Sequence, residues 1–302
     1  MKTVFTFPGQ GTQYPDMFRT MPDVNGRLSI AREILGDELD TLDSAAALQH
    51  TRAVQLALLI AGVCWADALI ARQVTPDIVS GLSIGAYPAA VIAGSLDFRD
   101  ALHLVALRGQ LMEQAYPHGY GMTAIMGLTL SQVEKIVAGS GAYISNLNAE
   151  TQIVIAGRDE QMAQVAQKAM ALGATRAKRL AVSVPSHCAL LDAPARKLAQ
   201  AFESVSLNRP RCAYLSGSSA RVIWQPERIA DDLAFNMART MHWEEAMIAA
   251  REREGRLAIE MPPGGILTCL TRQAHWEGES ISLERSGIDV ACHLARRLAQ
   301  AN

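Results

Sequence analysis

Residues 77–90 read DIVSGLSIGAYPAA and place a glycine-flanked serine between two apolar segments. Residues 77–80 end an apolar run typical of a buried strand, whereas the small residues at 86–93 favour a helix. The glycines at 81 and 85 allow a tight turn between them. A serine on such a turn is typical of a nucleophile elbow, where the helix N-terminus favours negative charge that forms nearby. The stretch predicts an α/β fold with Ser83 as a candidate nucleophile.

The Gly-x-Ser-x-Gly motif alone is weak evidence, because it occurs by chance in roughly one chain in ten of this length. An ordinary turn between a strand and a helix, with Ser83 as a capping residue, would have the same sequence. The motif alone leaves the two interpretations equally open, so other residues must decide between them.

Strands and helices alternate on both sides of this stretch, as expected of an α/β domain. Residues 4–7 predict a buried strand that ends at Pro8, and residues 51–72 predict a helix with Thr51 as its N-cap. Single further helices are predicted at 98–115, 190–203 and 287–300, more than one helix near 226–253, and further strands at 212–216 and 257–260.

Residues 119–187 contain a different order of predicted strands and helices, which indicates a second unit. Strands are expected at 123–128, 143–147, 152–156 and 174–183, and helices at 131–137 and 160–172. That β-α-β-β-α-β order is the ferredoxin-like arrangement. We therefore expect a small domain at 119–188, inserted into a larger α/β domain formed by 1–118 and 189–302.

The composition is that of an ordinary globular protein. Of the 302 residues, 49% are hydrophobic and 19% are charged, which excludes a disordered chain. The net charge of −2 gives no reason to expect nucleic acid or a membrane surface as a partner. The most apolar stretch, residues 56–66, is shorter than the ~18 residues of a membrane span and predicts a buried helix.

The five cysteines are scattered and form no Cys-x-x-Cys pair or Cys/His cluster. Neither a disulfide framework nor a zinc site is therefore expected, and no metal is predicted. The apolar run at the N-terminus is too short for a signal peptide. Because scattered cysteines suit a reducing compartment, we expect a cytoplasmic protein.

A serine nucleophile needs a base, and two of the seven histidines are candidates. His187 follows an apolar strand and the pair Pro185-Ser186, which places it at a strand end that faces a cleft. His242, beside Trp243, is the next candidate. A single histidine in such a context is more often structural than catalytic, and spacing alone does not choose between the two.

Two further residues have the chemistry of an acyl-transfer site. Gln10 lies in the loop FPGQGTQ, residues 7–13, and such loops supply backbone N–H groups to oxyanion holes, although a plain turn looks the same. Arg108 lies in a largely apolar helix, where a buried charge needs an anionic partner. Its fork geometry suits a carboxylate, while a structural salt bridge or a side chain that reaches solvent is equally compatible.

Together these segments resemble the malonyl-CoA:acyl-carrier-protein transacylase family in their motifs and in their order. The resemblance extends over nearly the whole chain. The matching segments are FPGQGTQ at 7–13, GLSIGAY at 81–87, RG at 108–109, NLN at 146–148, IVIAG at 153–157, VSVPSHC at 182–188 and, more loosely, Trp243 and EMPPG at 260–264.

The resemblance implies a large α/β-hydrolase-like domain with a smaller inserted ferredoxin-like domain, and it implies roles for the candidates. Ser83 would be the nucleophile and His187 its general base. The backbone N–H groups of Gln10 and Ile84 would form the oxyanion hole. Arg108 would bind the free malonyl carboxylate.

In this family a backbone carbonyl orients the histidine, rather than an acid side chain. The matching position here is His242. The resemblance implies no permanently bound cofactor, because malonyl-CoA and CoA are the substrate and the product.

The residues beside the nucleophile depart from the fatty-acid-synthesis members, which usually read GHSLGEY. Leu82 replaces the His, Ala86 replaces the Glu, and Pro262 stands where Gly is usual. This form resembles the malonyltransferase (epsilon) subunit of bacterial malonate decarboxylase. That resemblance implies transfer of malonyl to the thiol of the malonate decarboxylase acyl carrier protein, with other decarboxylase subunits as further partners.

Three alternatives stay open. The closest is the same reaction in fatty-acid synthesis. The second is a serine hydrolase such as a thioesterase, against which the lack of a clear triad acid weighs. The third is a catalytically silent subunit that docks a carrier protein, against which the joint presence of Ser83, His187, Gln10 and Arg108 weighs.

Overall fold

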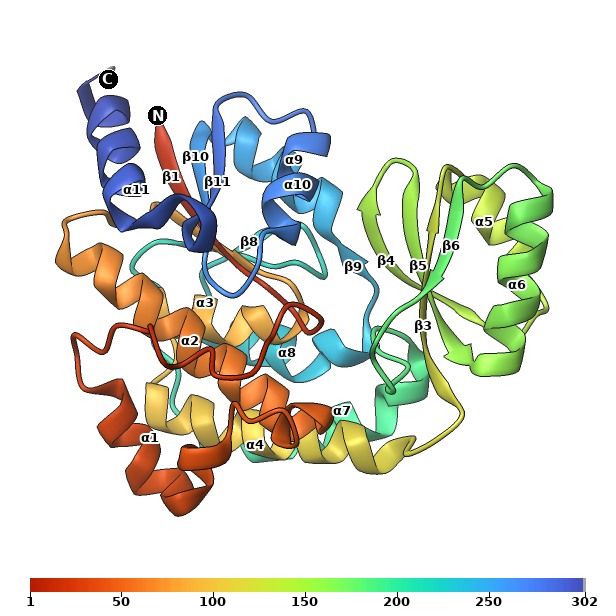
Figure 1. Cartoon of the computed structure of the whole chain (residues 1–302), viewed down its shortest axis with the longest axis horizontal. Helices are drawn as coiled ribbons and strands as arrows, with labels where there is room; N and C mark the ends of the chain where they lie inside the picture. The colour runs from red at the N-terminus through yellow and green to blue at the C-terminus, as the bar shows by residue number, and fades with distance from the viewer. Residues whose placement is uncertain (301–302) are drawn as a thin grey trace.

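The structure, a computed structural model, describes residues 1–300 and places them in a larger and a smaller α/β part (Figure 1). The larger part is built on a six-stranded sheet in the order β11-β10-β1-β2-β7-β8. Neighbouring strands pair in parallel, except that β7 and β8 are antiparallel. The strands are β1 (Lys2–Phe7), β2 (Ile78–Gly81), β7 (Ala213–Leu215), β8 (Val222–Ile223), β10 (Gly255–Glu260) and β11 (Glu279–Ser282).

The central strands of this sheet are apolar on both faces, as expected of a parallel sheet that helices cover. In β1, Val4 packs into the apolar cluster on one face, whereas Phe5 and Phe7 pack into the larger cluster on the other. β1 pairs with β2 on one side, where Phe7 lies opposite Gly81, and with β10 on the other, where Thr6 lies opposite Glu260. The carboxyl ends of these three strands therefore meet at one edge, which is where open α/β sheets place their ligand sites.

Helix α2 is the core helix of the larger part. It is long and apolar enough to cross a membrane by length and composition, but 89% of its apolar window is buried inside the protein. The buried helix predicted around residues 56–66 is confirmed. The helices of this part are α1 (Arg27–Leu35), α2 (Thr51–Ala71), α3 (Ala86–Ile92), α4 (Phe98–Ala115), α7 (Asp192–Phe202), α8 (Pro226–Phe235), α9 (Trp243–Glu252), α10 (Ile266–Gln273) and α11 (Leu283–Gln300).

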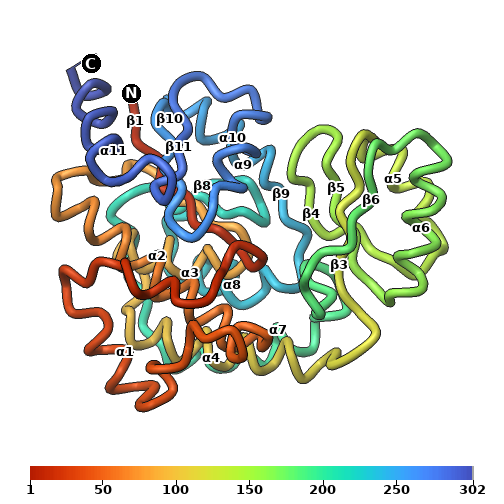
Figure 2. Tube along the Cα trace, in the orientation of Figure 1, coloured from red at the N-terminus to blue at the C-terminus, as the bar shows by residue number. Residues whose placement is uncertain are grey.

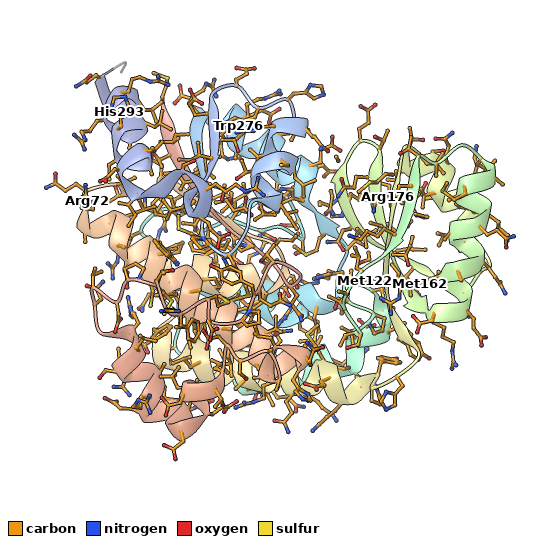
Figure 3. The ribbon with its side chains drawn as sticks, viewed as in Figure 1. Arg72, Met122, Met162, Arg176, Trp276 and His293 are labelled. Atoms are coloured by element: carbon orange, nitrogen blue, oxygen red, sulfur yellow. The ribbon has the colours of Figure 1, made fainter. Side chains whose placement is uncertain are left out.

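The smaller part is a sheet with two helices on one face (Figure 1). Its strands β6, β3, β5 and β4 lie side by side in that order, and each pair is antiparallel. Met162 packs in the core under the helices, whereas Met122 of β3 packs on the opposite face (Figure 3). In the chain, the elements follow the predicted β-α-β-β-α-β order: β3 (Tyr120–Met126), α5 (Leu130–Val137), β4 (Tyr143–Ala149), β5 (Gln152–Arg158), α6 (Asp159–Ala171) and β6 (Arg176–Arg179).

The chain enters the smaller part from α4 and leaves it into α7 (Figure 2). A fifth strand, β9 (Met241–His242), arrives from beyond residue 188 and pairs in parallel with β4. The sequence does not predict this strand, because two residues are too few for a periodic pattern. The small sheet is thus completed by a segment outside 119–188.

Two predicted elements differ from the structure. Of the helices expected near 226–253, α8 and α9 are present, but an unpredicted 3-10 turn at Asn236–Ala238 and the strand β9 lie between them. The strand expected over 174–183 ends at Arg179, because Val182 packs against the apolar cluster around Met122 and Val184 enters the main core instead of pairing. Both irregular segments contribute to the candidate site.

Candidate functional site

The carboxyl end of β2 continues directly into the turn that carries Ser83. This residue has φ = 57° and opens the 3-10 turn Ser83–Gly85, which leads into α3. A Cβ atom on Gly81 would collide with the backbone of Gly85, and one on Gly85 would collide with the backbone of Phe7. Only glycine fits at these two positions. The predicted strand–turn–helix setting is confirmed, and the positive φ at Ser83 is typical of a nucleophile elbow.

His187 lies in the irregular segment after β6 and contacts the larger part. Its backbone N–H donates to the carbonyl of Met237 (2.6 Å), and its Nδ1 lies 2.7 Å from the carbonyl oxygen of Asn236. Because a carbonyl oxygen can only accept, Nδ1 carries the proton and Nε2 keeps the free lone pair. This is the form of imidazole that a general base requires.

The carbonyl that orients His187 belongs to Asn236, so the prediction that His242 supplies it is wrong. His242 lies on β9, where its backbone N–H donates to the carbonyl of Gly217 (2.7 Å). The reason is the break between α8 and α9. In a continuous helix the carbonyl of Asn236 would point along the helix axis to the N–H four residues on, whereas here it accepts the N–H of Arg239 in the 3-10 turn (3.3 Å) and also the imidazole N–H of His187.

Burial sets the protonation state of His187. The pKa of this side chain is lowered from 6.5 to about 4, chiefly by burial and in part by the charge of Arg108, while the hydrogen bond to the Asn236 carbonyl acts in the opposite direction. His187 is therefore neutral throughout the physiological pH range, with Nε2 able to accept a proton.

We expect the rate of acyl-enzyme formation to stay constant through neutral pH and to fall in acid around pH 4, rather than around 6.5. Protonation of His187 would remove the lone pair that accepts the serine proton, and the lowered pKa moves that loss to more acidic solution. The measurement is kcat/KM from about pH 3.5 to 8, with circular dichroism at each pH as the control for folding. A midpoint at the ordinary histidine value would contradict this expectation.

Arg108 is fully buried in α4 and points at the candidate nucleophile. Its Nη2 lies 3.2 Å from Ser83 Oγ and 2.9 Å from Asn236 Oδ1, and its Nη1 lies 2.7 Å from Gln55 Oε1. No Asp or Glu among residues 1–300 forms an ion pair with it. Burial lowers the pKa of Arg108 to about 10, so the guanidinium is charged at pH 7. A positive charge without a counter-ion therefore lies beside Ser83.

Asn236 joins the three candidate residues, and the sequence did not single it out. Its backbone carbonyl accepts from His187, its Oδ1 accepts from Arg108, and its Nδ2 donates to the carbonyl of Ser83 (3.2 Å). The sequence carried no signal for it, because the stretch 226–253 was predicted to be helical and showed no turn at this position. Gln55 was also missed, although a lone amide in the apolar stretch 53–63 was a usable signal.

Of the two residues predicted for the oxyanion hole, Ile84 follows Ser83 directly and Gln10 lies in a loop that touches the elbow. Ile84 is the next residue in the chain and is fully buried. Gln10 lies in the loop after β1, where its Oε1 accepts from Gln55 Nε2 (3.1 Å). That loop touches the elbow closely, since a Cβ on Gly9 would lie 3.0 Å from the carbonyl oxygen of Leu82. These positions are compatible with the predicted role, which stays a prediction.

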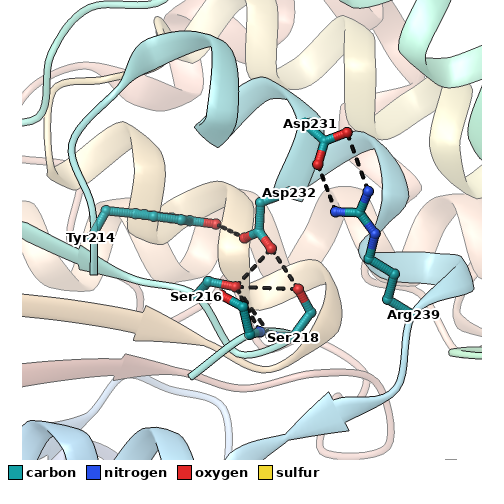
Figure 4. A network of polar contacts seen from close by, with 7 residues as sticks. Tyr214, Ser216, Ser218, Asp231, Asp232 and Arg239 are labelled. Atoms are coloured by element: carbon teal, nitrogen blue, oxygen red, sulfur yellow. Dashed lines mark hydrogen bonds and ion pairs between the residues drawn. The ribbon is translucent and has the colours of Figure 1, made fainter. Parts of the chain in front are cut away.

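The turn that carries Asn236 is fixed by buried hydrogen bonds at the end of α8. Tyr87 of α3 donates from its hydroxyl to the carbonyl of Leu233 (2.9 Å). The carboxylate of Asp232 accepts from three hydroxyl groups (Figure 4): those of Tyr214 (2.8 Å), Ser216 (2.7 Å) and Ser218 (2.6 Å). These bonds tie α8 to the large sheet and to the helix that follows Ser83.

Known acyl transferases are similar to this chain over almost its whole length. A family model described as the acyl transferase domain matches residues 4–287. The malonyl CoA-acyl carrier protein transacylase of Haemophilus influenzae is 34% identical over 299 residues, which cover 93% of this chain and 95% of that protein.

Solved structures share the fold. The malonyl CoA-acyl carrier protein transacylase of Coxiella burnetii superposes with a TM-score of 0.92 at 30% identity, covering 99% of this chain and 98% of that one. A malonyl-transacylase in complex with its type II PKS acyl-carrier protein gives a TM-score of 0.86 at 32% identity, with coverage of 93% and 94%. The α/β fold predicted from the sequence is confirmed.

Proposed function

Because the chain belongs to the acyl transferase family, we propose that it moves a malonyl group from malonyl-CoA to the thiol of an acyl carrier protein through an ester on Ser83. The observation that carries this proposal is the buried charge of Arg108, 3.2 Å from Ser83 Oγ. In a malonyl ester, one methylene separates the free carboxylate from the ester carbonyl. A buried guanidinium without a counter-ion at this distance favours an acyl group that ends in a carboxylate.

The first half-reaction makes the acyl-enzyme. Ser83 Oγ attacks the thioester carbonyl and passes its proton to Nε2 of His187. Backbone N–H groups of Gln10 and Ile84 hold the tetrahedral oxyanion, at a gain of about 3 kcal/mol for each donor. The C–S bond then breaks, and the CoA sulfur leaves with the proton that His187 returns.

The second half-reaction runs in the opposite direction with a new thiol. His187 takes the proton of the carrier thiol while the sulfur attacks the malonyl-Ser83 ester. The C–O bond breaks, and Ser83 Oγ leaves with the proton from His187. The scheme uses no permanently bound cofactor. A reducing cytoplasm, expected from the scattered cysteines, suits a free thiol as acceptor.

The acceptor that the relatives support best is an acyl carrier protein of the fatty-acid-synthesis type. The relative from Haemophilus influenzae and the structure from Coxiella burnetii are both malonyl CoA-acyl carrier protein transacylases, and a third transacylase binds its acyl-carrier protein. This supports the alternative reading of the sequence better than the malonate decarboxylase setting.

The carrier protein of malonate decarboxylase is retained as a second candidate because of Leu82, Ala86 and Pro262. Leu82 and Ala86 lie within three residues of Ser83 in the chain, and Pro262 follows the end of β10; Ala86 and Pro262 are buried. Because these residue types resemble those of the decarboxylase subunit, they support a specialised member of the family. Other decarboxylase subunits would then be partners.

Offering both carriers to the purified enzyme tests the proposal. With labelled malonyl-CoA and equal concentrations of the two thiol-bearing carriers, we expect kcat/KM to favour the fatty-acid-type carrier by about 10-fold or more. Carriers that lack their prosthetic thiol are the control. The opposite preference would establish the decarboxylase setting. Release of free malonate, fast and without any carrier, would contradict transfer and indicate a hydrolase.

A further inference from the structure

The partners of Arg108 are all neutral. Its guanidinium binds the amide oxygens of Gln55 and Asn236 and the hydroxyl of Ser83, and its Nε, buried as well, has no hydrogen-bond partner within residues 1–300. The nearest ring, that of Tyr87, lies 5.8 Å from the guanidinium carbon. The cation is therefore oriented by dipoles, and its charge is not balanced.

Both amides are themselves held in place. Gln55 is fully buried in α2, and its Nε2 lies 3.1 Å from Gln10 Oε1 and 3.3 Å from the sulfur of Met112. Asn236 is 1% exposed, and its Nδ2 donates to the backbone carbonyl of Ser83. Each amide thus uses its oxygen for Arg108 and its nitrogen for a second partner, which fixes the direction in which the oxygen points.

Neutral acceptors and acidic acceptors have different consequences at this site. An amide oxygen satisfies an N–H group but leaves the net charge of the guanidinium in place, and in a low-dielectric interior that charge attracts an incoming anion strongly. A carboxylate at the same position would satisfy the same N–H group and also cancel the charge. Arg108 would then be a structural ion pair with little preference for an acidic acyl group.

We propose that Gln55 and Asn236 are specificity-determining positioning residues, which hold Arg108 within reach of the acyl group on Ser83 and leave its charge unbalanced. The acyl carboxylate then becomes the first counter-ion of Arg108. This inference rests on the proposed function, because it concerns which acyl group reaches Ser83.

Gln55→Glu is the decisive variant, because it changes an amide into a carboxylate of the same shape. The measurement is kcat/KM for acylation of the enzyme by malonyl-CoA and by acetyl-CoA, read by intact-protein mass spectrometry. We expect the malonyl-to-acetyl ratio of kcat/KM to fall by about 100-fold, the scale on which buried charge pairs couple. An unchanged ratio would overturn the inference.

Gln55→Met is the matched control. Methionine has a similar length and also breaks the hydrogen bond to Arg108, but it brings no charge. We expect the ratio to fall by about 10-fold at most, since only one hydrogen bond to a charged group is lost. If Met and Glu lower the ratio equally, the neutrality of the amide is not the determinant and the inference is overturned.

Asn236→Asp tests the same idea from the other side of the guanidinium, and it keeps the inference testable if Gln55→Glu does not fold. We expect the same fall in the malonyl-to-acetyl ratio, with thermal unfolding as the check on folding. The wild-type enzyme distinguishes a failure of the proposed function from a failure of the role assigned to the two amides. If it shows no preference for malonyl-CoA, the proposed function fails. If it shows that preference and both acidic variants keep it, only the role of the amides fails.

Discussion

Replacing Ser83 with alanine is expected to abolish formation of the malonyl-enzyme and to lower transfer by at least about 10⁴-fold. The substitution removes the Oγ that attacks the thioester, together with one hydrogen bond of Arg108, and keeps the backbone of the turn. In particular, the Cβ atom that the backbone must accommodate at φ = 57° is already present in serine. The loss therefore reports on the nucleophile and not on the turn.

Intact-protein mass after mixing with malonyl-CoA measures this directly, because the acyl group stays on the protein when no carrier is present. Ser80→Ala, on the strand β2 that leads into the elbow, is the matched control. Ser80 is fully buried, and its hydroxyl has no hydrogen-bond partner in the part of the chain that the structure describes, so its loss should leave acylation near the wild-type rate. Undiminished acylation of Ser83→Ala would show that another residue is the nucleophile.

Replacing Arg108 with alanine is expected to lower kcat/KM for malonyl-CoA by about 10³-fold, which is the scale of losing one partner of a buried, hydrogen-bonded charge pair. The acetyl group has no carboxylate that could pair with Arg108, so kcat/KM for acetyl-CoA should fall far less. The same change removes the donor to the amide oxygens of Gln55 and Asn236. We expect part of the loss with acetyl-CoA to come from these two unsatisfied amides.

Arg108→Lys separates charge from geometry. Lysine keeps the positive charge but lacks the planar fork that binds two amide oxygens and Ser83 Oγ together. We expect an intermediate loss with malonyl-CoA, and the comparison of both variants with both thioesters supplies the test. Equal losses for malonyl-CoA and acetyl-CoA in Arg108→Ala would remove the assigned role of the arginine.

The parts of the site that the sequence predicted are those formed by residues close together in the chain. The elbow at Ser83 needs a strand, two close glycines and a helix, and all of these lie within residues 77–93. The contact of Arg108 with Ser83 follows less directly. A charged residue in an apolar helix showed that some anion must be near, but only the packing of α4 beside the elbow identifies where.

The parts that the sequence did not predict depend on breaks in helices and on distant segments. Asn236 and His242 lie in a stretch predicted to be helical, and local periodicity cannot show that the chain leaves the helix at Asn236. The carbonyl that orients His187 was assigned to His242 from the family resemblance, six residues after Asn236, which supplies it. Gln55 lies in α2, far along the chain from its partner Arg108, so that no spacing rule joins them.

The strand β9 bears on any attempt to exchange the smaller part between acyl transferases. A graft cut at residues 119 and 188 would carry β4 without the segment that pairs with its Asn146 and Leu147. The transplanted sheet would then present an open edge, and unpaired backbone groups along such an edge invite pairing between molecules. A chimaera in which residues 241–242 come from the same parent as β4 keeps that edge closed, and it is the design from which a soluble hybrid is to be expected.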